Sequence, residues 1–296
     1  MPNNSLHTGL NFSKNRAFIS DLANLTADKV AATLAYRDFN ISLNTEVLLN
    51  NESSAQDELI DGLSAFINEN TSQKLSFVID NSLVNSTSVP YSGDLTEEEL
   101  AELVDNEFSL IVGEKKSFYI YEWAPIKQNK VLIFWIPEII IARLQLIVSR
   151  LGKNLTIVDL EPLSIINLVN EKHVLPDEGK LNIIIKFEDD YFSITGYEKS
   201  ELVFYEIYYK NSPVDCPFHI IKLLKMHQIE LRNLQKIYWY GKELPQSLSN
   251  LQSVLNKPAE SLFESLKILF HRHSECGNLH LDSSVPSLSV ALRNES

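Results

Sequence analysis

The chain has 296 residues, of which 44% are hydrophobic, and its 26 Lys and Arg against 39 Asp and Glu give a formal charge of −13 at pH 7. This is the composition of a folded globular protein, long enough for one large core or two linked ones. The negative charge, without a local basic stripe, argues against binding to nucleic acid or to anionic lipid surfaces.

Cysteine content and hydropathy set further bounds. Cys216 and Cys276 are the only cysteines, too few for a disulfide framework. The N-terminal residues lack the basic and then apolar order of a signal peptide. The longest apolar run, 131–141, is far shorter than the roughly 20 residues that span a bilayer. We therefore expect a cytoplasmic protein.

The first 80 residues are predicted to hold several strands and one helix. Residues 1–13 are polar and are predicted to form a disordered tail. Apolar residues at helical spacing predict a helix over 55–69, and 75–79 return as a strand. Before the helix, turn-rich residues separate three short segments with strand character, 17–20, 30–37 and 41–49. Their close spacing favours an antiparallel meander.

Residues 85–128 are predicted to form a small α+β insertion in the first domain. Thr96 and Glu99 match a capping box, which predicts that an amphipathic helix begins there. Residues 117–123 alternate between apolar and polar and predict an edge strand.

The stretch 130–162 consists of an apolar run, a helix and a second apolar run. Residues 131–136 predict a strand buried on both faces, and Pro137 opens an amphipathic helix that ends at Gly152. Residues 155–160 predict the second strand. Two strands joined by a helix of about four turns are predicted to lie parallel, with a right-handed crossover.

The β-β-β-α-β order of the first 80 residues returns in the second half of the chain. The predicted elements there are a connecting helix, three strands, a helix and a strand, at 163–171, 181–187, 191–197, 201–209, 217–227 and 236–240. A three-strand meander with crossover helices that occurs twice is the plan of the actin-like and ribonuclease-H-like duplicated fold. The sequence therefore predicts an α/β fold with two lobes.

Several motifs resemble, in the same order, those of the PilM family of type IV pilus assembly proteins. Residues 89–100 resemble the family's helix entry, 130–137 its buried strand and 157–162 its V-D-x-E ending. The tail 288–293, Leu-Ser-Val-Ala-Leu-Arg, resembles the closing G-L-A-L-R helix, with Ser289 in the place of the glycine. The similarity covers roughly residues 14–295.

The resemblance implies an actin-like organisation. A first lobe over 14–165 carries the insertion, a second lobe covers 166–284, and a C-terminal helix over 285–296 returns to the first lobe. It also implies a protein peripheral to the inner membrane, in a type IV pilus or type II secretion-like platform. There it would bind the short N-terminal cytoplasmic tail of a membrane partner.

The groove for that tail is implied between the first lobe and its insertion, around 81–91 and 117–123. A sheet edge beside small polar residues can accept an extended peptide through backbone hydrogen bonds. The candidate partner-binding residues are Ser82, Asn85, Ser86 and Thr87.

The resemblance also implies an ATP site between the lobes, but the phosphate loops are degenerate. Such loops need glycine, because the backbone adopts positive φ and approaches the phosphates closely. The first loop, matched to 19–29, keeps an acid at Asp21 and has no glycine. In the second, Lys186 replaces an Asp and Glu188 a Gly, while the adenosine-side strand keeps only Gly241. We therefore expect no bound ATP or Mg²⁺, and expect Lys186 to pair with Glu188 or Asp21 as a structural group.

The leading prediction is a non-catalytic scaffold, since no nucleophile elbow, Walker loop or dinucleotide fingerprint occurs. Two alternatives stay open: an active actin-like ATPase that binds MgATP between the lobes, and an actin-fold protein of unrelated role. His271, His273, Cys276 and His280 are potential zinc ligands, but their spacing matches no zinc module, so a polar surface loop and no metal are predicted.

Overall fold

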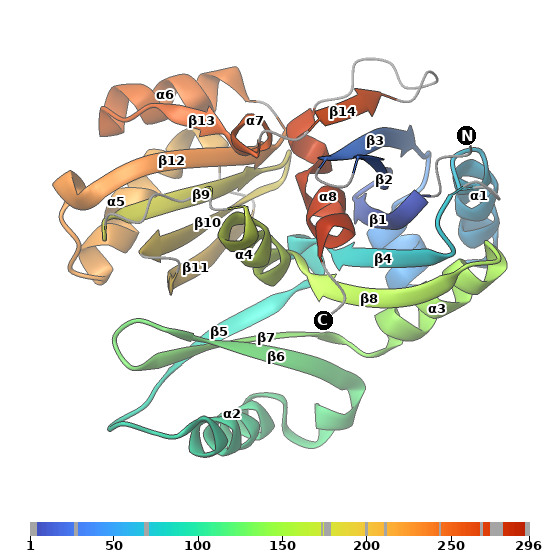
Figure 1. Cartoon of the computed structure of the whole chain (residues 1–296). Coiled ribbons are helices and arrows are strands. Elements are labelled where there is room, and N and C mark those ends of the chain that lie inside the picture. The colour runs from blue at the N-terminus through green and yellow to red at the C-terminus, as the bar shows by residue number, and fades with distance from the viewer. Residues whose placement is uncertain are drawn as a thin grey trace.

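The computed structural model describes residues 5–26, 29–67, 71–172, 174, 179–198, 201–209, 212–242, 244–266, 269–272 and 281–293. Two lobes, each built on a mixed sheet, lie side by side above a smaller third unit (Figure 1). The predicted α/β class with two lobes is confirmed.

The first lobe holds a six-stranded sheet in the order β14-β3-β2-β1-β4-β8. Its strands are β1 (Ser5–Ser13), β2 (Arg16–Thr26), β3 (Lys29–Asp38), β4 (Lys74–Ile79), β8 (Asn154–Leu160) and β14 (Leu269–Arg272). The meander β1-β2-β3 is antiparallel, while β4 lies parallel to both β1 and β8. The lobe's helices are the π-helix η1 (Leu43–Leu49), α1 (Ser53–Ser64), α3 (Ile139–Arg150) and α4 (Glu161–Glu171).

The second lobe repeats this plan. Its sheet order β11-β10-β9-β12-β13 matches β3-β2-β1-β4-β8 strand for strand, so the predicted duplication is confirmed. The strands are β9 (Leu181–Phe187), β10 (Tyr191–Glu198), β11 (Glu201–Tyr209), β12 (Leu234–Gly241) and β13 (Ala259–Ser261). The helices are α5 (Cys216–Met226), α6 (Pro245–Leu255) and α7 (Leu262–Ser265). Short 3-10 helices join elements throughout: η2 (Asn81–Leu83), η3 (Gly113–Phe118), η4 (Pro213–Asp215), η5 (Leu231–Asn233) and η6 (Leu281–Ser284).

The third unit is the insertion, a three-stranded antiparallel sheet with one helix. Its strand order is β5 (Asn85–Pro90), β7 (Lys130–Pro137) and β6 (Tyr119–Ile126). Helix α2 (Glu97–Val112) begins with the predicted capping box and packs on one face of the sheet. The opposite face joins the main core, where the Phe134 ring lies 5.4 Å from that of Tyr205 in β11. The insertion therefore contacts the second lobe as well as the first.

The C-terminal helix α8 (Val285–Leu292) lies against the first-lobe strands β1, β2 and β4 (Figure 1). Its approach is very close, because a Cβ built at Gly9 in β1 would lie 2.0 Å from the Ser287 carbonyl oxygen. Beyond the helix, Arg293 Nη1 donates to Asp159 Oδ2 at 2.5 Å. Two motifs of the family resemblance, the V-D-x-E ending and the closing tail, thus meet in space.

The predicted N-terminal tail is wrong for residues 5–13, which form β1 at the interior of the first sheet. Leu10 and Phe12 enter the core, while polar side chains of the same strand are also buried and have hydrogen-bond partners. His7 Nε2 lies 2.6 Å from Ser76 Oγ, and Asn11 Nδ2 donates to the Val78 carbonyl. Because these buried polar side chains have hydrogen-bond partners, the strand can contain them, and its sequence resembles that of a solvated tail.

The antiparallel meander is confirmed, but its three strands are β1, β2 and β3, so it begins one strand earlier in the chain than predicted. The segment 41–49 is not a strand, since η1 occupies Leu43–Leu49 and the Ser42 side chain accepts a hydrogen bond from the Thr45 amide at its start. A serine cap satisfies an otherwise unpaired amide, which favours the helical turn over an extended segment.

The predicted parallel pair of 131–136 and 155–160 is also wrong. Both strands and the helix between them exist, but β7 is the middle strand of the insertion sheet and β8 is an edge of the first-lobe sheet. Both edges of β7 are taken by β5 and β6. The insertion therefore extends to Pro137 and not to 128, and α3 carries the chain from one sheet to the other.

Candidate functional site: a buried charge cluster between the lobes

Two equivalent hairpins face each other where the lobes meet. The β1–β2 hairpin turns at Lys14 and Asn15, and the β9–β10 hairpin at 188–190. Between them lies a cavity of about 520 Å³ lined by both lobes. An exposed ion pair crosses it, with Lys14 Nζ 3.8 Å from Asp190 Oδ2, and such a pair contributes little stability.

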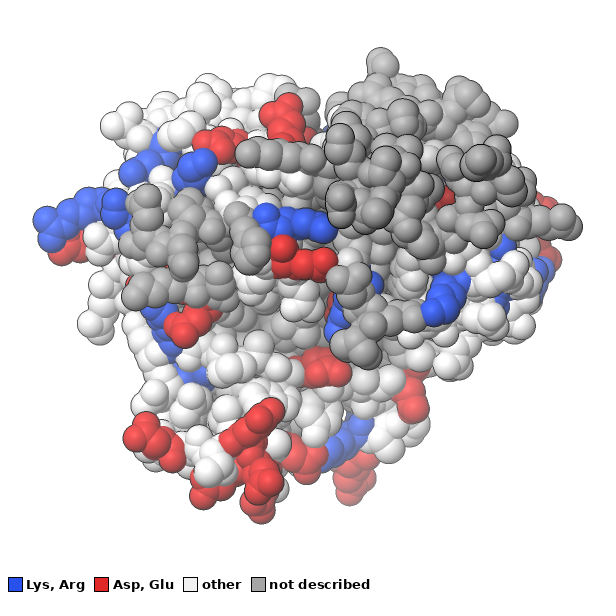
Figure 2. All heavy atoms as spheres, viewed as in Figure 1, with Lys and Arg blue, Asp and Glu red and all other residues white. Residues whose placement is uncertain are grey.

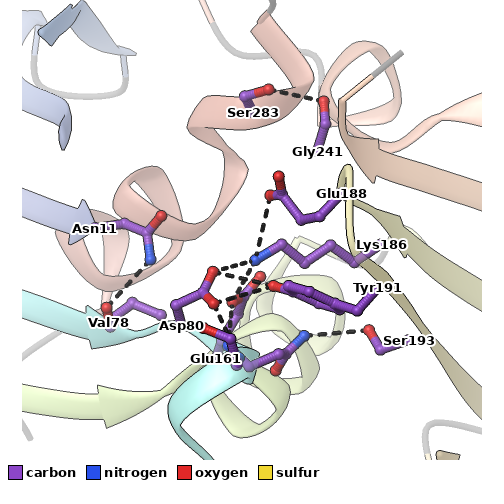
Figure 3. Close-up of polar contacts among 12 residues, drawn as sticks. Asn11, Val78, Asp80, Glu161, Lys186, Glu188, Tyr191, Ser193, Gly241 and Ser283 are labelled. Carbon is purple, nitrogen blue, oxygen red and sulfur yellow. Dashed lines mark hydrogen bonds and ion pairs between the residues drawn. The ribbon is translucent and has the colours of Figure 1, made fainter. Parts of the chain in front are cut away.

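Beneath this cavity, Lys186 is buried among acids (Figure 3). Its Nζ lies 2.6 Å from Asp80 Oδ2, 2.8 Å from Glu161 Oε2 and 3.6 Å from Glu188 Oε1. Asp80 follows β4 in the first lobe and Glu161 opens α4 directly after β8, whereas Lys186 belongs to β9 in the second lobe. The cluster therefore joins the two lobes.

Local structure holds the acids in place. Asp80 caps η2 and accepts the Ser82 amide at 2.9 Å, while Glu161 Oε2 accepts the Asn81 amide at 3.0 Å. Carboxylates at helix starts are favoured because they satisfy free backbone N–H groups and face the positive end of the helix dipole. Each acid is thus held by a backbone hydrogen bond as well as by the ammonium.

Tyrosines and an asparagine extend the contact. The Tyr191 hydroxyl lies 3.1 Å from both carboxylate oxygens of Asp80, and Asn81 Nδ2 donates to Ser193 Oγ at 3.1 Å. Tyr209 donates to the Asn81 carbonyl at 3.3 Å. Asp80 and Asn81 consequently contact all three meander strands of the second lobe.

The pKa values follow from burial and charge. Burial raises the pKa of Glu188 to about 7 and also raises that of Glu161, although the Lys186 ammonium opposes both shifts. For Asp80, burial is outweighed by the ammonium and by hydrogen bonds from Lys186 and Ser82, which lower its pKa. Burial works against the Lys186 ammonium, but the acids around it, Asp80 first, raise its pKa. Lys186 and Asp80 are therefore an ionised pair at neutral pH.

Three of the four predicted loop positions meet here. Lys186 pairs with Glu188 as predicted, and Gly241 lies at the end of the adjacent strand β12 with φ +89°. A Cβ at Gly241 would lie 2.4 Å from the Phe187 carbonyl oxygen, so only glycine fits, and Ser283 Oγ donates to the Gly241 carbonyl. Close strand packing explains this glycine without reference to a nucleotide.

Asp21 is not part of the cluster. The segment 19–29 was matched to the first phosphate loop, but Arg16–Thr26 is strand β2, and the corresponding hairpin turns at Lys14 and Asn15. Asp21 accepts a hydrogen bond from Thr8 Oγ1 at 2.5 Å within the sheet, so the predicted pairing of Lys186 with Asp21 is wrong. The match to the first phosphate loop failed because it was placed at the end of β2 and not at the turn between β1 and β2.

Sequence reasoning missed Asp80, Glu161 and Tyr191. Glu161 lies inside the V-D-x-E motif, and Asp80 follows the apolar run 75–79, so both carried a usable signal. An acid directly after a buried strand is a common position for a functional side chain, because strand ends converge at one edge of a sheet.

A second candidate site, which we call the edge groove, lies between the insertion and the first lobe. It has a volume of about 840 Å³ and runs between β6 and β8, the terminal strands of their sheets within the described residues. Apolar side chains and charged or polar groups both line it. Its lining includes Ile120, Glu122, Ile136, Ile141, Ile157 and Arg293.

The predicted partner-binding residues lie elsewhere. The predicted edge strand 117–123 does line the edge groove through β6. Ser82 instead lines the cavity between the lobes, where its Oγ accepts from Asn44 Nδ2 at 3.0 Å. Asn85, Ser86 and Thr87 lie in β5, at the other side of the insertion sheet from β6. Peptide binding at these four residues stays a prediction.

The predicted metal-ligand segment is only partly described. His273, Cys276 and His280 lie outside the described residues, and His271 is the third residue of β14. Within the described part of the chain, no group of three or more His, Cys, Asp and Glu side chains could hold a metal ion, and no helix is long and apolar enough to cross a membrane.

Several solved structures share this architecture. A chain of the PilM–PilN type IV pilus biogenesis complex matches with a TM-score of 0.67 and 14% identity, over 98% of this chain and 97% of that one. A Bacteroides thetaiotaomicron protein of unknown function with an actin-like ATPase fold matches with a TM-score of 0.57 and 14% identity, over 89% of this chain and 93% of that one. This chain has the actin-like ATPase fold.

The PilM-like resemblance found in the sequence is therefore supported by the fold. The cytoplasmic domain of EpsL, an inner-membrane component of the type II secretion system of Vibrio cholerae, matches with a TM-score of 0.51 and 6% identity, over 96% of this chain and 94% of that one. No protein-family model and no curated protein sequence matches the chain.

Proposed function

We propose that this PilM-like protein is a non-catalytic scaffold, located in the cytoplasm at the inner membrane, of a type IV pilus or type II secretion-like platform. It binds the N-terminal cytoplasmic tail of a membrane partner. The observation that carries the proposal is the edge groove, where β6 and β8, each the terminal strand of its sheet among the described residues, line one space. The likeness to a chain of a PilM–PilN complex and to the EpsL cytoplasmic domain supports the choice of machine.

An extended peptide is the ligand that fits this groove. Unpaired strand edges present backbone N–H and C=O groups that a peptide strand can pair with. Apolar side chains at Ile120, Ile141 and Ile157 provide contacts for every second side chain of such a strand. Ordering a flexible tail costs a few kcal/mol, so we expect micromolar affinity, roughly −8 kcal/mol.

Charge at the groove selects the peptide further. Lys74 and Arg293 line it together with Glu122 and Asp159, and the Arg293–Asp159 pair ties the C-terminal segment to the floor. A tail with apolar anchors and polar residues of both signs complements this lining better than a uniformly charged one.

The absence of catalysis is proposed from the charge cluster. A polyphosphate in the cavity between the lobes would meet Glu188, Asp189 and Asp190, and Lys242 beside them is already paired with Asp189 at 2.5 Å. Acids near phosphate oxygens repel them unless a cation intervenes. The alternative, an ATPase that binds MgATP there, is favoured by the cavity and by the actin-like ATPase fold.

The test compares the edge groove with strand β5, which lies at the opposite edge of the insertion sheet. The full-length protein and two variants, Ile157→Glu in the edge groove and Thr87→Glu in β5, are used to capture proteins from native membranes. We expect the wild-type protein and Thr87→Glu to recover a protein with a short cytoplasmic N-terminal tail and one transmembrane helix, and Ile157→Glu to lose it. A synthetic peptide of that tail then gives the dissociation constant by calorimetry.

The opposite pattern would move the binding site to β5, as the sequence predicted. If none of the three proteins recovers a membrane partner, or if the tail peptide binds all three equally, the scaffold mechanism is wrong. Circular dichroism of both variants confirms that their folds are intact.

A further inference from the structure

The environment of Lys186 is that of a bound cation. The carboxylates of Asp80, Glu161 and Glu188 come from three separate segments. Each has an oxygen within 3.6 Å of the Lys186 ammonium nitrogen. The ring centroid of Tyr191 lies 5.3 Å from the same nitrogen. Carboxylate oxygens gathered from separate elements are the ligands that hard cations such as Mg²⁺ and Ca²⁺ prefer.

We infer that Asp80, Glu161 and Glu188 form a cation-binding site whose cation is the chain's own Lys186 ammonium, and that this internal cation holds the two lobes together without a ligand between them. The inference concerns the core between the lobes and does not depend on the edge groove or its partner.

Burial makes the ammonium necessary. The side chains of Lys186, Asp80 and Glu161 are at most 2% exposed, so water cannot screen the acids from one another. Two or three carboxylates this close repel strongly in a medium of low polarity unless a positive charge lies among them. Because Lys186 is covalently part of β9, the charge cannot dissociate, and the first-lobe acids stay attached to the second lobe.

The cavity gives access to the site from outside. Asp80, Glu188 and Tyr191 line the cavity between the lobes, whereas Lys186 does not. Asp80 and Glu188 thus contact both the cavity and the ammonium, and Figure 3 shows these side chains around Lys186. Shortening Lys186 would open a space beside three carboxylates, two of which line the cavity.

This geometry predicts chemical rescue. Lys186→Ala should lose stability because the acids lose their cation, and the melting temperature should fall by roughly 5–15 °C. Millimolar MgCl₂, CaCl₂ or methylammonium chloride should restore most of that loss, whereas NaCl of equal ionic strength should not. The wild-type protein should not respond to any of these cations.

Two matched variants separate charge from packing. Lys186→Met fills nearly the same volume without charge, so it should be destabilised and should resist rescue. Lys242→Ala removes an exposed lysine at the same cavity, paired with Asp189, and should melt within about 2 °C of the wild type. Small-angle X-ray scattering should show a larger radius of gyration for Lys186→Met than for the wild type, and no increase for Lys242→Ala.

Three results would overturn the inference. The first is a Lys186→Met protein with wild-type stability and scattering, and the second is a wild-type protein stabilised by Mg²⁺ or Ca²⁺. The third is Lys186→Ala that no cation rescues.

If Lys186→Ala does not fold, the neutral triple variant Asp80→Asn/Glu161→Gln/Lys186→Met must give soluble folded protein, and its failure to fold would also refute the charge argument. Loss of partner binding in Ile157→Glu, with unchanged melting, would test the scaffold separately.

Discussion

The two lobes repeat one strand plan but carry different chemistry at matching positions. Asn11 in β1 and Lys186 in β9 occupy the same register beside the parallel strands β4 and β12. Just past the ends of those strands stand Asp80 in the first lobe and Lys242 in the second. At these two matching positions the first lobe thus has a neutral side chain and an acid, whereas the second lobe has two cations.

The difference shows where the lobes are joined. Asn11 donates to the Val78 carbonyl inside its own sheet, and Lys242 pairs with Asp189 at the surface of its own lobe. Only Lys186 and Asp80 are both buried and reach across. One position in each lobe therefore forms the contact, while its counterpart in the other lobe stays local.

Removing the buried acid should have the largest effect. Asp80→Ala leaves the Lys186 ammonium without its nearest partner, and breaking a buried ion pair in this way costs about 3–5 kcal/mol of unfolding free energy. The counterpart Lys242→Ala should cost less than about 1 kcal/mol, because that pair is half exposed. Urea denaturation of both variants checks the contrast, and equal losses would contradict it.

Helix α8 packs closely on β1, so the packing glycine should matter in the first lobe. Gly9→Ala places a Cβ 2.0 Å from the Ser287 carbonyl oxygen, and we expect a loss of about 1–3 kcal/mol from the forced shift of α8. In the second lobe, Ile184 occupies the register position of Gly9. Thermal denaturation measures the loss, and a Gly9→Ala protein as stable as the wild type would show that α8 adjusts freely.

Glu188 should make stability depend on pH. Its pKa is raised from 4.5 to about 7 by burial, with Asp80 and Glu161 adding to the shift and Lys186 and Ser13 opposing it. The folded protein therefore keeps a proton that the unfolded chain releases, and the unfolding free energy contributed by this group falls as pH rises from about 4.5 to 7. Glu188→Gln should remove about 1–3 kcal/mol of that pH dependence.

The measurement compares wild type and Glu188→Gln by urea denaturation from pH 5 to pH 8. The difference in stability between the two proteins should change across this range and become constant above pH 7.5. A constant difference throughout would show that Glu188 titrates normally.

The smallest expected effect is that of nucleotide. If the acids around Lys186 exclude polyphosphate, millimolar MgATP should leave the melting temperature unchanged, whereas a ligand at 100 times its dissociation constant would add about 2.7 kcal/mol. Lys186→Asp should be destabilised and should not hydrolyse ATP. A clear thermal shift with MgATP, or turnover by Lys186→Asp, would favour the ATPase alternative.

The second lobe was predicted more accurately from sequence than the first. Its strands are continuous apolar runs, such as 183–185, that can only be buried. In β1 the buried polar residues His7, Thr8 and Asn11 concealed the strand, because burial of polar groups depends on partners distant in sequence. That error displaced the first phosphate-loop match and led to the choice of Asp21.

The sequence by itself determined most of the local elements, the duplication and the positions of Lys186, Glu188 and Gly241. Periodicity, caps and turn residues act over a few neighbours, so they can be recognised without the fold. Only the tertiary structure decided that β7 and β8 belong to different sheets, and that Asp80 meets Lys186 across 106 residues of chain. The partner of a strand edge or of a carboxylate cannot be recognised from the neighbouring residues in sequence. The free energy of the pairing depends on which groups the fold brings within a few ångströms.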